Sequence, residues 1–102
     1  MKSLLSLIVA LSALAAAPAF ANPELAQKKN CMACHAVDKK LVGPAYKDVA
    51  AKYRGNKGAE AELIKKVKAG GKGTWGDIQM PPNAHVKDDD IKAIVQWILS
   101  LK

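Results

Sequence analysis

The chain has 102 residues, enough for one domain only, and its 16 Lys+Arg against 9 Asp+Glu give a formal charge of +7. Half of the residues are apolar, and the composition excludes a disordered tail, a repeat array and a polytopic membrane protein. The apolar residues concentrate at the N-terminus, where residues 1–21 hold 16 of them. The 81 residues that follow contain four aromatic side chains. We therefore expect a thin core that needs a disulfide, a metal or a cofactor.

Residues 1–21 have the three-part layout of a secretory signal peptide. Lys2 gives a positive start, residues 4–17 form an uncharged apolar run, and Ala19-Phe20-Ala21 supplies small residues for cleavage. A retained membrane anchor is the alternative, but the run is short for spanning a bilayer. We expect cleavage at the end of this segment and a mature domain over residues 22–102, exported to the periplasm without stable membrane insertion. Nucleic acid is absent from that compartment and is not an expected partner.

The first half of the mature chain predicts two helices. Asn22-Pro23-Glu24 is typical of a helix start, with a capping Asn, a proline at the first position and an acid in the first turn. We expect the first helix from residue 25 to about residue 35. Pro44 opens a second helix over residues 45–53, which Gly55 ends.

The second half predicts two more helices, separated by a long loop. Residues 59–69 form the third, ended by Gly70-Gly71, and the loop runs from residue 70 to residue 87. The last helix begins with Asp88-Asp89-Asp90, which we expect to cap free N–H groups and oppose the positive end of the dipole. Its apolar residues recur at helical spacing: Ile91, Ile94, Val95, Ile98 and Leu99. With no sustained strand alternation, the fold class is all-α.

The only two cysteines, Cys31 and Cys34, stand in the run Cys-Met-Ala-Cys-His, which ends at His35. This run is the c-type haem attachment pattern. On a helix, residues three and four apart share a face, so the two thiols and the imidazole point the same way. The thiols can form thioethers with the two vinyl groups at one porphyrin edge, while His35 reaches the iron as the proximal axial ligand.

Three other interpretations compete with haem attachment. A thioredoxin-like dithiol belongs beside a βαβ pattern, which the chain lacks. A plain disulfide would close too short a loop to add much stability. A zinc site needs two further ligands, and the only other histidine is His85. Export, helical context and the thin core favour one covalently attached haem c.

The sixth position of the iron has three candidate ligands, namely Met32, Met80 and His85. Met32 lies inside the attachment motif on the wrong face. Met80 heads Met80-Pro81-Pro82, and a thioether on a proline-stiffened segment loses little entropy on ligation. His85 would give bis-His coordination and a lower potential, and an open position is the remaining alternative. We predict Met80 as the distal ligand, a pairing that raises the potential and suits electron transfer.

The mature chain resembles the small bacterial class I cytochromes c of the cytochrome c-551/c-552 group. The resemblance covers essentially all of residues 22–102, in the family's order and at nearly its spacing. Besides the attachment motif, it rests on residues 42–51, Gly73-Thr74-Trp75-Gly76, Met80-Pro81-Pro82-Asn83 and residues 96–100. One departure is an extra residue near His85. The resemblance implies a cytochrome c fold, four short helices and loops packed around one covalently bound haem c.

The resemblance also implies roles for four residues around the haem. The Pro44 carbonyl would accept a hydrogen bond from the proximal histidine, which supports a metal-bound imidazole. Trp75 and Lys66 would meet a haem propionate, although some members have Arg at the position of Lys66. The Asn83 side chain would orient the methionine ligand.

Basic residues concentrate in residues 28–72, which carry 12 basic and 4 acidic side chains. A solvated lysine surface that keeps the protein soluble is one interpretation. The other is a positive face that steers docking to acidic patches on redox protein partners.

We interpret the chain as a soluble, monomeric electron carrier and not an enzyme. It would shuttle single electrons between partners such as a cytochrome-reducing complex and a nitrite reductase or terminal oxidase. The alternatives are a peroxidase-like haem enzyme with a displaceable sixth ligand, and a thiol–disulfide protein without haem.

Overall fold

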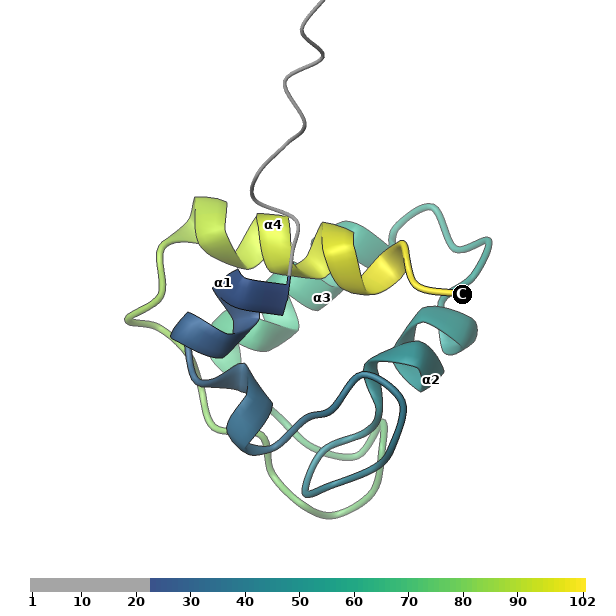
Figure 1. The fold of residues 1–102 in the computed structure, drawn as a ribbon, viewed down its shortest axis with the longest axis horizontal. Coiled ribbons are helices and arrows are strands. Elements are labelled where there is room, and N and C mark those ends of the chain that lie inside the picture. The colour runs from purple at the N-terminus through teal and green to yellow at the C-terminus, as the bar shows by residue number, and fades with distance from the viewer. Residues whose placement is uncertain (1–22) are drawn as a thin grey trace, which may run out of the picture.

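The computed structural model describes residues 23–102, so the predicted signal peptide and Asn22 lie outside the described residues. The described chain is all-α, as predicted (Figure 1). Its elements are α1 (Pro23–Lys28), the short 3-10 helix η1 (Cys31–Ala33), α2 (Tyr46–Lys52), α3 (Ala59–Ala69) and α4 (Asp88–Leu99). Residues 23–102 contain no strand, and none of their helices is long and apolar enough to cross a membrane.

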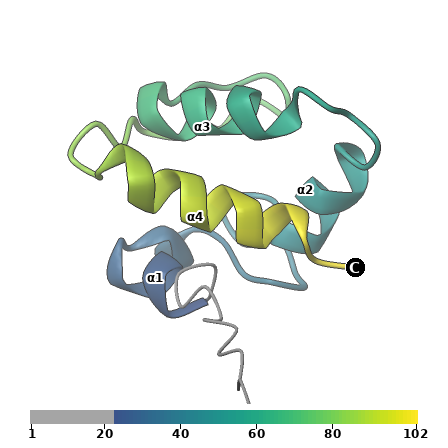
Figure 2. The same ribbon diagram turned by 90° about the horizontal axis from the view of Figure 1, so that it is seen from above.

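Helix α4 is the centre of the packing, because it contacts α1, α2 and α3. Figure 2 shows α4 between α3 on one side and α1 on the other. Its predicted apolar periodicity explains this position, since Ile91 and Val95 are completely buried. Full burial of one such side chain stabilises the fold by about 2 kcal/mol. The apolar face of α4 therefore organises the other three helices.

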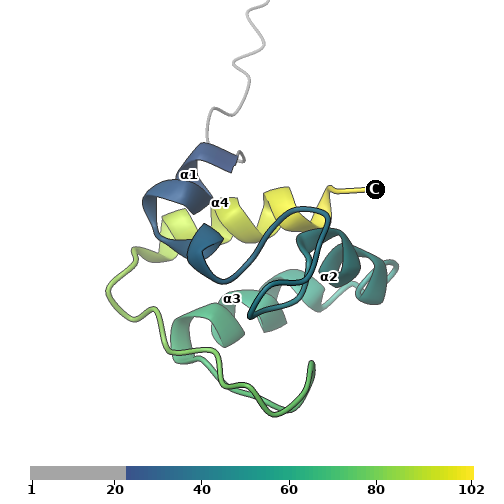
Figure 3. The same ribbon diagram turned by 60° about the horizontal axis from the view of Figure 1, so that its bottom comes forward.

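Helix α3 has the predicted bounds and leads into the long loop of residues 70–87 (Figure 3). The loop returns beside the end of α3, where an isolated antiparallel bridge joins Gly71 to Met80. Helix α2 begins and ends one residue inside its predicted bounds, with Ala45 and Tyr53 as its caps. Both the loop and α2 contribute residues to the wall of the cavity described below.

The prediction of one continuous helix to about residue 35 was wrong. Helix α1 ends at Lys28, and Asn30 takes a left-handed conformation with φ of 64° before η1 begins. Asparagine tolerates this conformation, which stops a right-handed helix. One helical turn remains, because the His35 N–H donates to the Cys31 carbonyl at 3.1 Å. The shared face expected for the motif therefore depends on this single turn.

The acidic run begins the last helix as predicted, but it does not cap it. Asp88, Asp89 and Asp90 form the first turn of α4, and its N-cap is Lys87, with no side-chain capping hydrogen bond. Their carboxylates still lie at the positive end of the helix dipole. Two of them pair with lysines, Asp90 with Lys29 just after α1 and Asp88 with Lys68 of α3. The run therefore connects helices as well as opposing the dipole.

Candidate haem site

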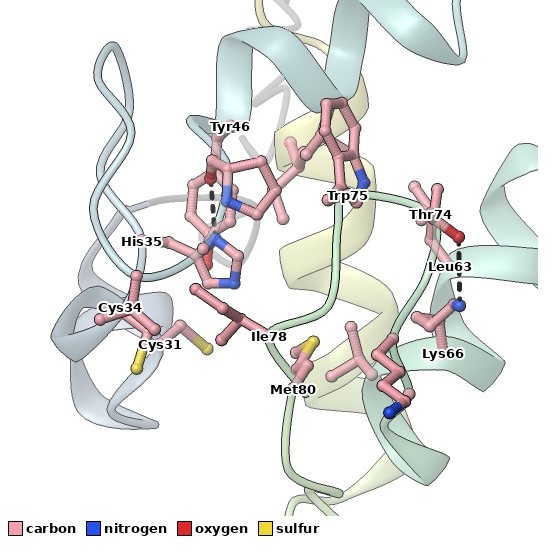
Figure 4. A pocket seen from close by; sticks show the side chains of 18 of the residues that line it. Cys31, Cys34, His35, Tyr46, Leu63, Lys66, Thr74, Trp75, Ile78 and Met80 are labelled. Atoms are coloured by element: carbon pink, nitrogen blue, oxygen red, sulfur yellow. Dashed lines mark hydrogen bonds between the residues drawn. The ribbon is translucent and has the colours of Figure 1, made fainter.

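A cavity of about 330 Å³ opens between α2, α3, α4 and the loop of residues 70–87. Figure 4 shows Cys31, Cys34 and His35 on one side of it and Met80 on the other. Between them the walls are mostly apolar: Tyr46, Val49, Leu63, Val67, Ile94, Val95 and Ile98 line the cavity. His35 and Met80 are 45 positions apart in the sequence. The fold brings both of them to the wall of this cavity.

Cys31 and Cys34 are both free, half-buried thiols at the cavity wall. Burial raises the pKa of the Cys31 thiol, and its hydrogen bonds offset part of that rise. Burial also raises the pKa of Tyr46, which lies beside it, well above the usual range for tyrosine. Both groups are therefore held in their neutral forms, which suits the edge of an apolar cofactor.

His35 is fixed by three contacts. Its Nδ1 lies 2.8 Å from the Pro44 carbonyl, which can only accept, so Nδ1 carries the proton and donates. This bond leaves Nε2 as the ring nitrogen with a free lone pair. Tyr46 stacks on the ring at 4.8 Å between centroids, and a Cβ on Gly43 would lie 2.5 Å from the ring carbon Cε1. The absence of a side chain at Gly43 thus makes room for the imidazole.

Met80 is held by its backbone. The Met80 N–H donates to the Gly71 carbonyl at 2.8 Å, and the Gly71 N–H donates to the Met80 carbonyl at 3.0 Å. Pro81 also lines the cavity next to it. The alternative ligands lie elsewhere, because neither Met32 nor His85 lines the cavity, and His85 is exposed.

Lys66 and Trp75 both line the cavity, on the side away from the cysteines (Figure 4). The Lys66 ammonium lies 3.5 Å from the Thr74 hydroxyl, and Trp75 remains 41% exposed. The Lys52 ammonium lies 5.5 Å from the centre of the Trp75 ring, close enough for a cation–π contact. Donors from α3 and the loop therefore meet at one edge of the cavity, where an anionic group could be bound.

Asn83 lies outside the cavity lining. Its side-chain amide donates to the carbonyls of Val67 and Pro81, both at 3.2 Å. It therefore ties the segment that carries Met80 to the end of α3 through backbone groups. The part that Asn83 plays toward the methionine side chain stays a prediction.

The sequence did not single out several residues that shape the cavity. Tyr46 contacts both His35 and Trp97, the latter edge-on at 5.5 Å between ring centroids. The apolar spacing of α4 identified Ile94 and Ile98 only as core residues, although both also face the cavity. Helical spacing predicts that a side chain is buried but not whether it contacts protein or a cofactor. No sequence signal therefore distinguished core residues from cavity residues.

The residues around the cavity fit a covalently bound haem. Two free thiols and an imidazole nitrogen stand at one wall, a thioether stands at another, and apolar side chains lie between them. These are the donors that c-type haem binding uses. Within residues 23–102, no three His, Cys, Asp or Glu side chains gather to hold a metal ion directly, as the zinc interpretation would need.

Comparisons with known proteins agree with this fit. Residues 22–102 match the family model Cytochrome c. The chain is 57% identical over 94 residues to cytochrome c-551 of Allochromatium vinosum, covering 91% of this chain and 100% of that protein. It is 52% identical over 101 residues to cytochrome c-551 of Pseudomonas aeruginosa, covering 98% and 96%.

A solved structure gives the same result for the fold. The crystal structure of wild-type cytochrome c552 from Nitrosomonas europaea matches with a TM-score of 0.77 at 53% identity, over 79% of this chain and 100% of that one. The predicted cytochrome c fold and the predicted cofactor are thereby confirmed. The chain belongs to the cytochrome c family as a small class I member of the c-551/c-552 group, an electron carrier with one covalently bound haem c.

Proposed function

We propose that Cys31 and Cys34 attach the haem, that His35 and Met80 are its axial ligands, and that the protein carries single electrons without turning over a substrate. The observation that supports this most is the single cavity with both thiols and the His35 ring at one wall and Met80 at another. Haem c with histidine and methionine ligands supplies reversible one-electron chemistry at a raised potential.

The chain's own residues would keep the ligand set constant in both oxidation states. The Pro44 carbonyl fixes the proton on His35 Nδ1 and orients the ring. The bridge between Gly71 and Met80 holds the methionine backbone. Little rearrangement then accompanies electron transfer, and no position is left open for a substrate. This argues against the peroxidase-like alternative.

Lys66 and Trp75 are our candidates for binding a haem propionate at the cavity edge, and Asn83 for holding the Met80 segment.

Lys40 and Lys72 also line the cavity. We propose that the lysine-rich residues 28–72 guide docking to acidic patches on redox proteins. The rate of electron exchange with a physiological partner should then fall as ionic strength rises. A rate independent of salt would contradict this role.

We further propose that residues 1–21 direct export and are removed, leaving a monomeric carrier of residues 22–102 in the periplasm. A cytochrome-reducing complex as donor, and a nitrite reductase or terminal oxidase as acceptor, would suit such a carrier. Mass measurement of the protein matured in an oxidising compartment should give the chain from Asn22 plus one haem. An unmodified chain with two thiols would instead support the thiol–disulfide alternative.

Substitution of Met80 tests the ligand assignment. The oxidised wild-type protein should show the near-red absorption band of sulfur–iron ligation, and its reduced form should bind carbon monoxide slowly. Met80→Ala should lose the band, bind carbon monoxide rapidly and have a lower potential, with the haem mass unchanged. Met32→Ala is the matched control and should keep the band. Rapid, complete carbon monoxide binding by the wild type would favour the haem enzyme.

A further inference from the structure

Helix α3 ends at a glycine with an unusual backbone. Gly70 has φ of 74° and ψ of −172°, and its N–H donates to the Lys66 carbonyl at 2.7 Å. A positive φ at this position is typical of a helix end, and glycine adopts it without steric cost. Helix termination alone would explain a glycine here. It does not explain how closely another segment approaches.

The segment that carries Met80 returns directly onto this helix end. Two hydrogen bonds pair Met80 with Gly71, as described above, and the Asn83 N–H donates to the Val67 carbonyl at 3.1 Å. The Asn83 side chain donates to the same carbonyl. Hydrogen bonds of Met80 on one side and of Asn83 on the other therefore hold the Pro81-Pro82 dipeptide close to the end of α3.

A side chain at Gly70 would collide with that segment. A Cβ there would lie 2.5 Å from the Met80 carbonyl oxygen, 2.8 Å from the Pro82 nitrogen and 3.0 Å from the Pro81 carbonyl carbon. All three are backbone atoms, and two belong to the peptide bond between the prolines. Because proline fixes φ, this segment cannot turn aside locally. It would have to move as a unit, together with Met80.

We propose that Gly70 is a positioning residue for Met80. Its missing side chain lets the loop backbone close onto α3 and thereby sets how far the thioether reaches into the cavity. This inference rests on the proposed role of Met80 as the distal ligand. Gly70 itself does not line the cavity, so it would act on the ligand only through the backbone of residues 80–82.

The test compares Gly70→Ala with Gly55→Ala in the mature, haem-containing protein. Gly55 has φ of 83°, close to that of Gly70, but a Cβ there meets no atom within 4 Å. Both variants place an alanine at a positive φ, and only Gly70→Ala adds the collision with the loop backbone. The readouts are the near-red sulfur–iron band of the oxidised protein, carbon monoxide binding by the reduced protein, and helix content by circular dichroism.

We expect Gly70→Ala to lose most of the near-red band and to bind carbon monoxide rapidly while helix content and haem mass are unchanged. Gly55→Ala should keep the band. Equal bands in the two variants would overturn the inference and leave the ligand assignment intact. A wild-type protein without the band would instead overturn the assignment itself.

A double variant, Gly70→Ala with Pro82→Ala, keeps the test decisive where the single variant does not fold. Removing the ring of Pro82 lets the segment bend away from the new Cβ. We expect the double variant to recover part of the band relative to Gly70→Ala alone. A double variant as deficient as the single one would count against the collision as the cause.

Discussion

His35 and Met80 face one cavity, but the chain holds them by different means. Around His35, the attachment segment (residues 31–46) supplies a carbonyl that accepts a hydrogen bond from the ring and a tyrosine stacked on it. It also supplies a glycine whose missing side chain leaves room for the ring. Around Met80, the ligand loop (residues 70–83) supplies backbone bonds to the end of α3. The imidazole is thus fixed directly, whereas the thioether is fixed only through its main chain. We infer that the ligand loop is the weaker of the two.

Removal of the haem should abolish the difference between the two regions by unfolding both. The cavity of about 330 Å³ lies between α2, α3, α4 and the ligand loop. Without the haem, the apolar walls of this cavity would lose their contact partner and meet water, which a small domain of marginal stability cannot offset. The mature chain with Cys31→Ala and Cys34→Ala, prepared without haem, should therefore lose cooperative unfolding. A sigmoidal thermal melt of this haem-free chain would contradict the expectation.

Gly43→Ala tests how tightly the attachment segment holds His35. The added Cβ would lie 2.5 to 3.0 Å from three atoms of the ring, and overpacking of this kind costs about 1–3 kcal/mol. The midpoint of denaturant unfolding of the haem-containing protein measures this loss. In the control Gly58→Ala, the nearest atom would lie 3.6 Å away. Equal stability of the two variants would show that the ring has room to move.

Two ion pairs join the start of α4 to the two regions, one beside the ligand loop and one beside the attachment segment. Removing each in turn compares how much stability the two regions gain from contacts outside the cavity. Lys68 lies 2.7 Å from Asp88 and also donates to the Val86 carbonyl at 2.7 Å, next to the ligand loop. Lys29 lies 3.6 Å from Asp90, next to the attachment segment. An exposed pair contributes about 0.5 kcal/mol, and the bond to a carbonyl adds about as much again.

Lys68→Met should therefore lower the free energy of unfolding by about 1 kcal/mol, roughly twice the effect of Lys29→Met. Methionine keeps most of the apolar stem, so the loss of packing is similar in both variants. If Lys29→Met were the more costly change, the base of the ligand loop would not depend on Lys68. Denaturant titrations at low and high salt separate the ion pair from the hydrogen bond.

The smallest expected effect is a pH dependence at Tyr53, which caps α2 and lines the cavity between the two regions. Burial, and then the charge of Glu62, raises its pKa in the folded protein. The folded state therefore holds the proton more tightly than the unfolded state. This contribution is fully present below the ordinary tyrosine pKa of about 10 and is lost as pH rises through the folded pKa.

Tyr53→Phe removes the titrating group and should make the alkaline loss of stability shallower than in the wild type. The difference in free energy of unfolding between the two proteins should stay constant up to about pH 9 and change above it. A constant difference up to the alkaline limit would show that Tyr53 titrates normally.

The sequence predicted the parts of this molecule that local patterns determine. Helices α3 and α4 follow from apolar spacing, and the attachment motif is contiguous in the chain. The break at Asn30 could not be predicted, because the same residues continue a helix unless tertiary packing selects the left-handed conformation. The stacking of Tyr46 on His35 and the approach of Pro81 to Gly70 depend on how distant segments return to one another. Neither has a periodic or local signal.

Denaturation of the haem-containing protein, followed by two probes, tests the difference between the regions most directly. The near-red band reports the bond from Met80 to iron, and far-ultraviolet circular dichroism reports the helices. We predict that the band is lost at a lower guanidinium concentration than the helical signal, since the hydrogen bonds to the ligand loop hold the backbone around Met80 and not its thioether. Coincident loss of the two signals in a single transition would contradict the account, because both regions would then be equally stable.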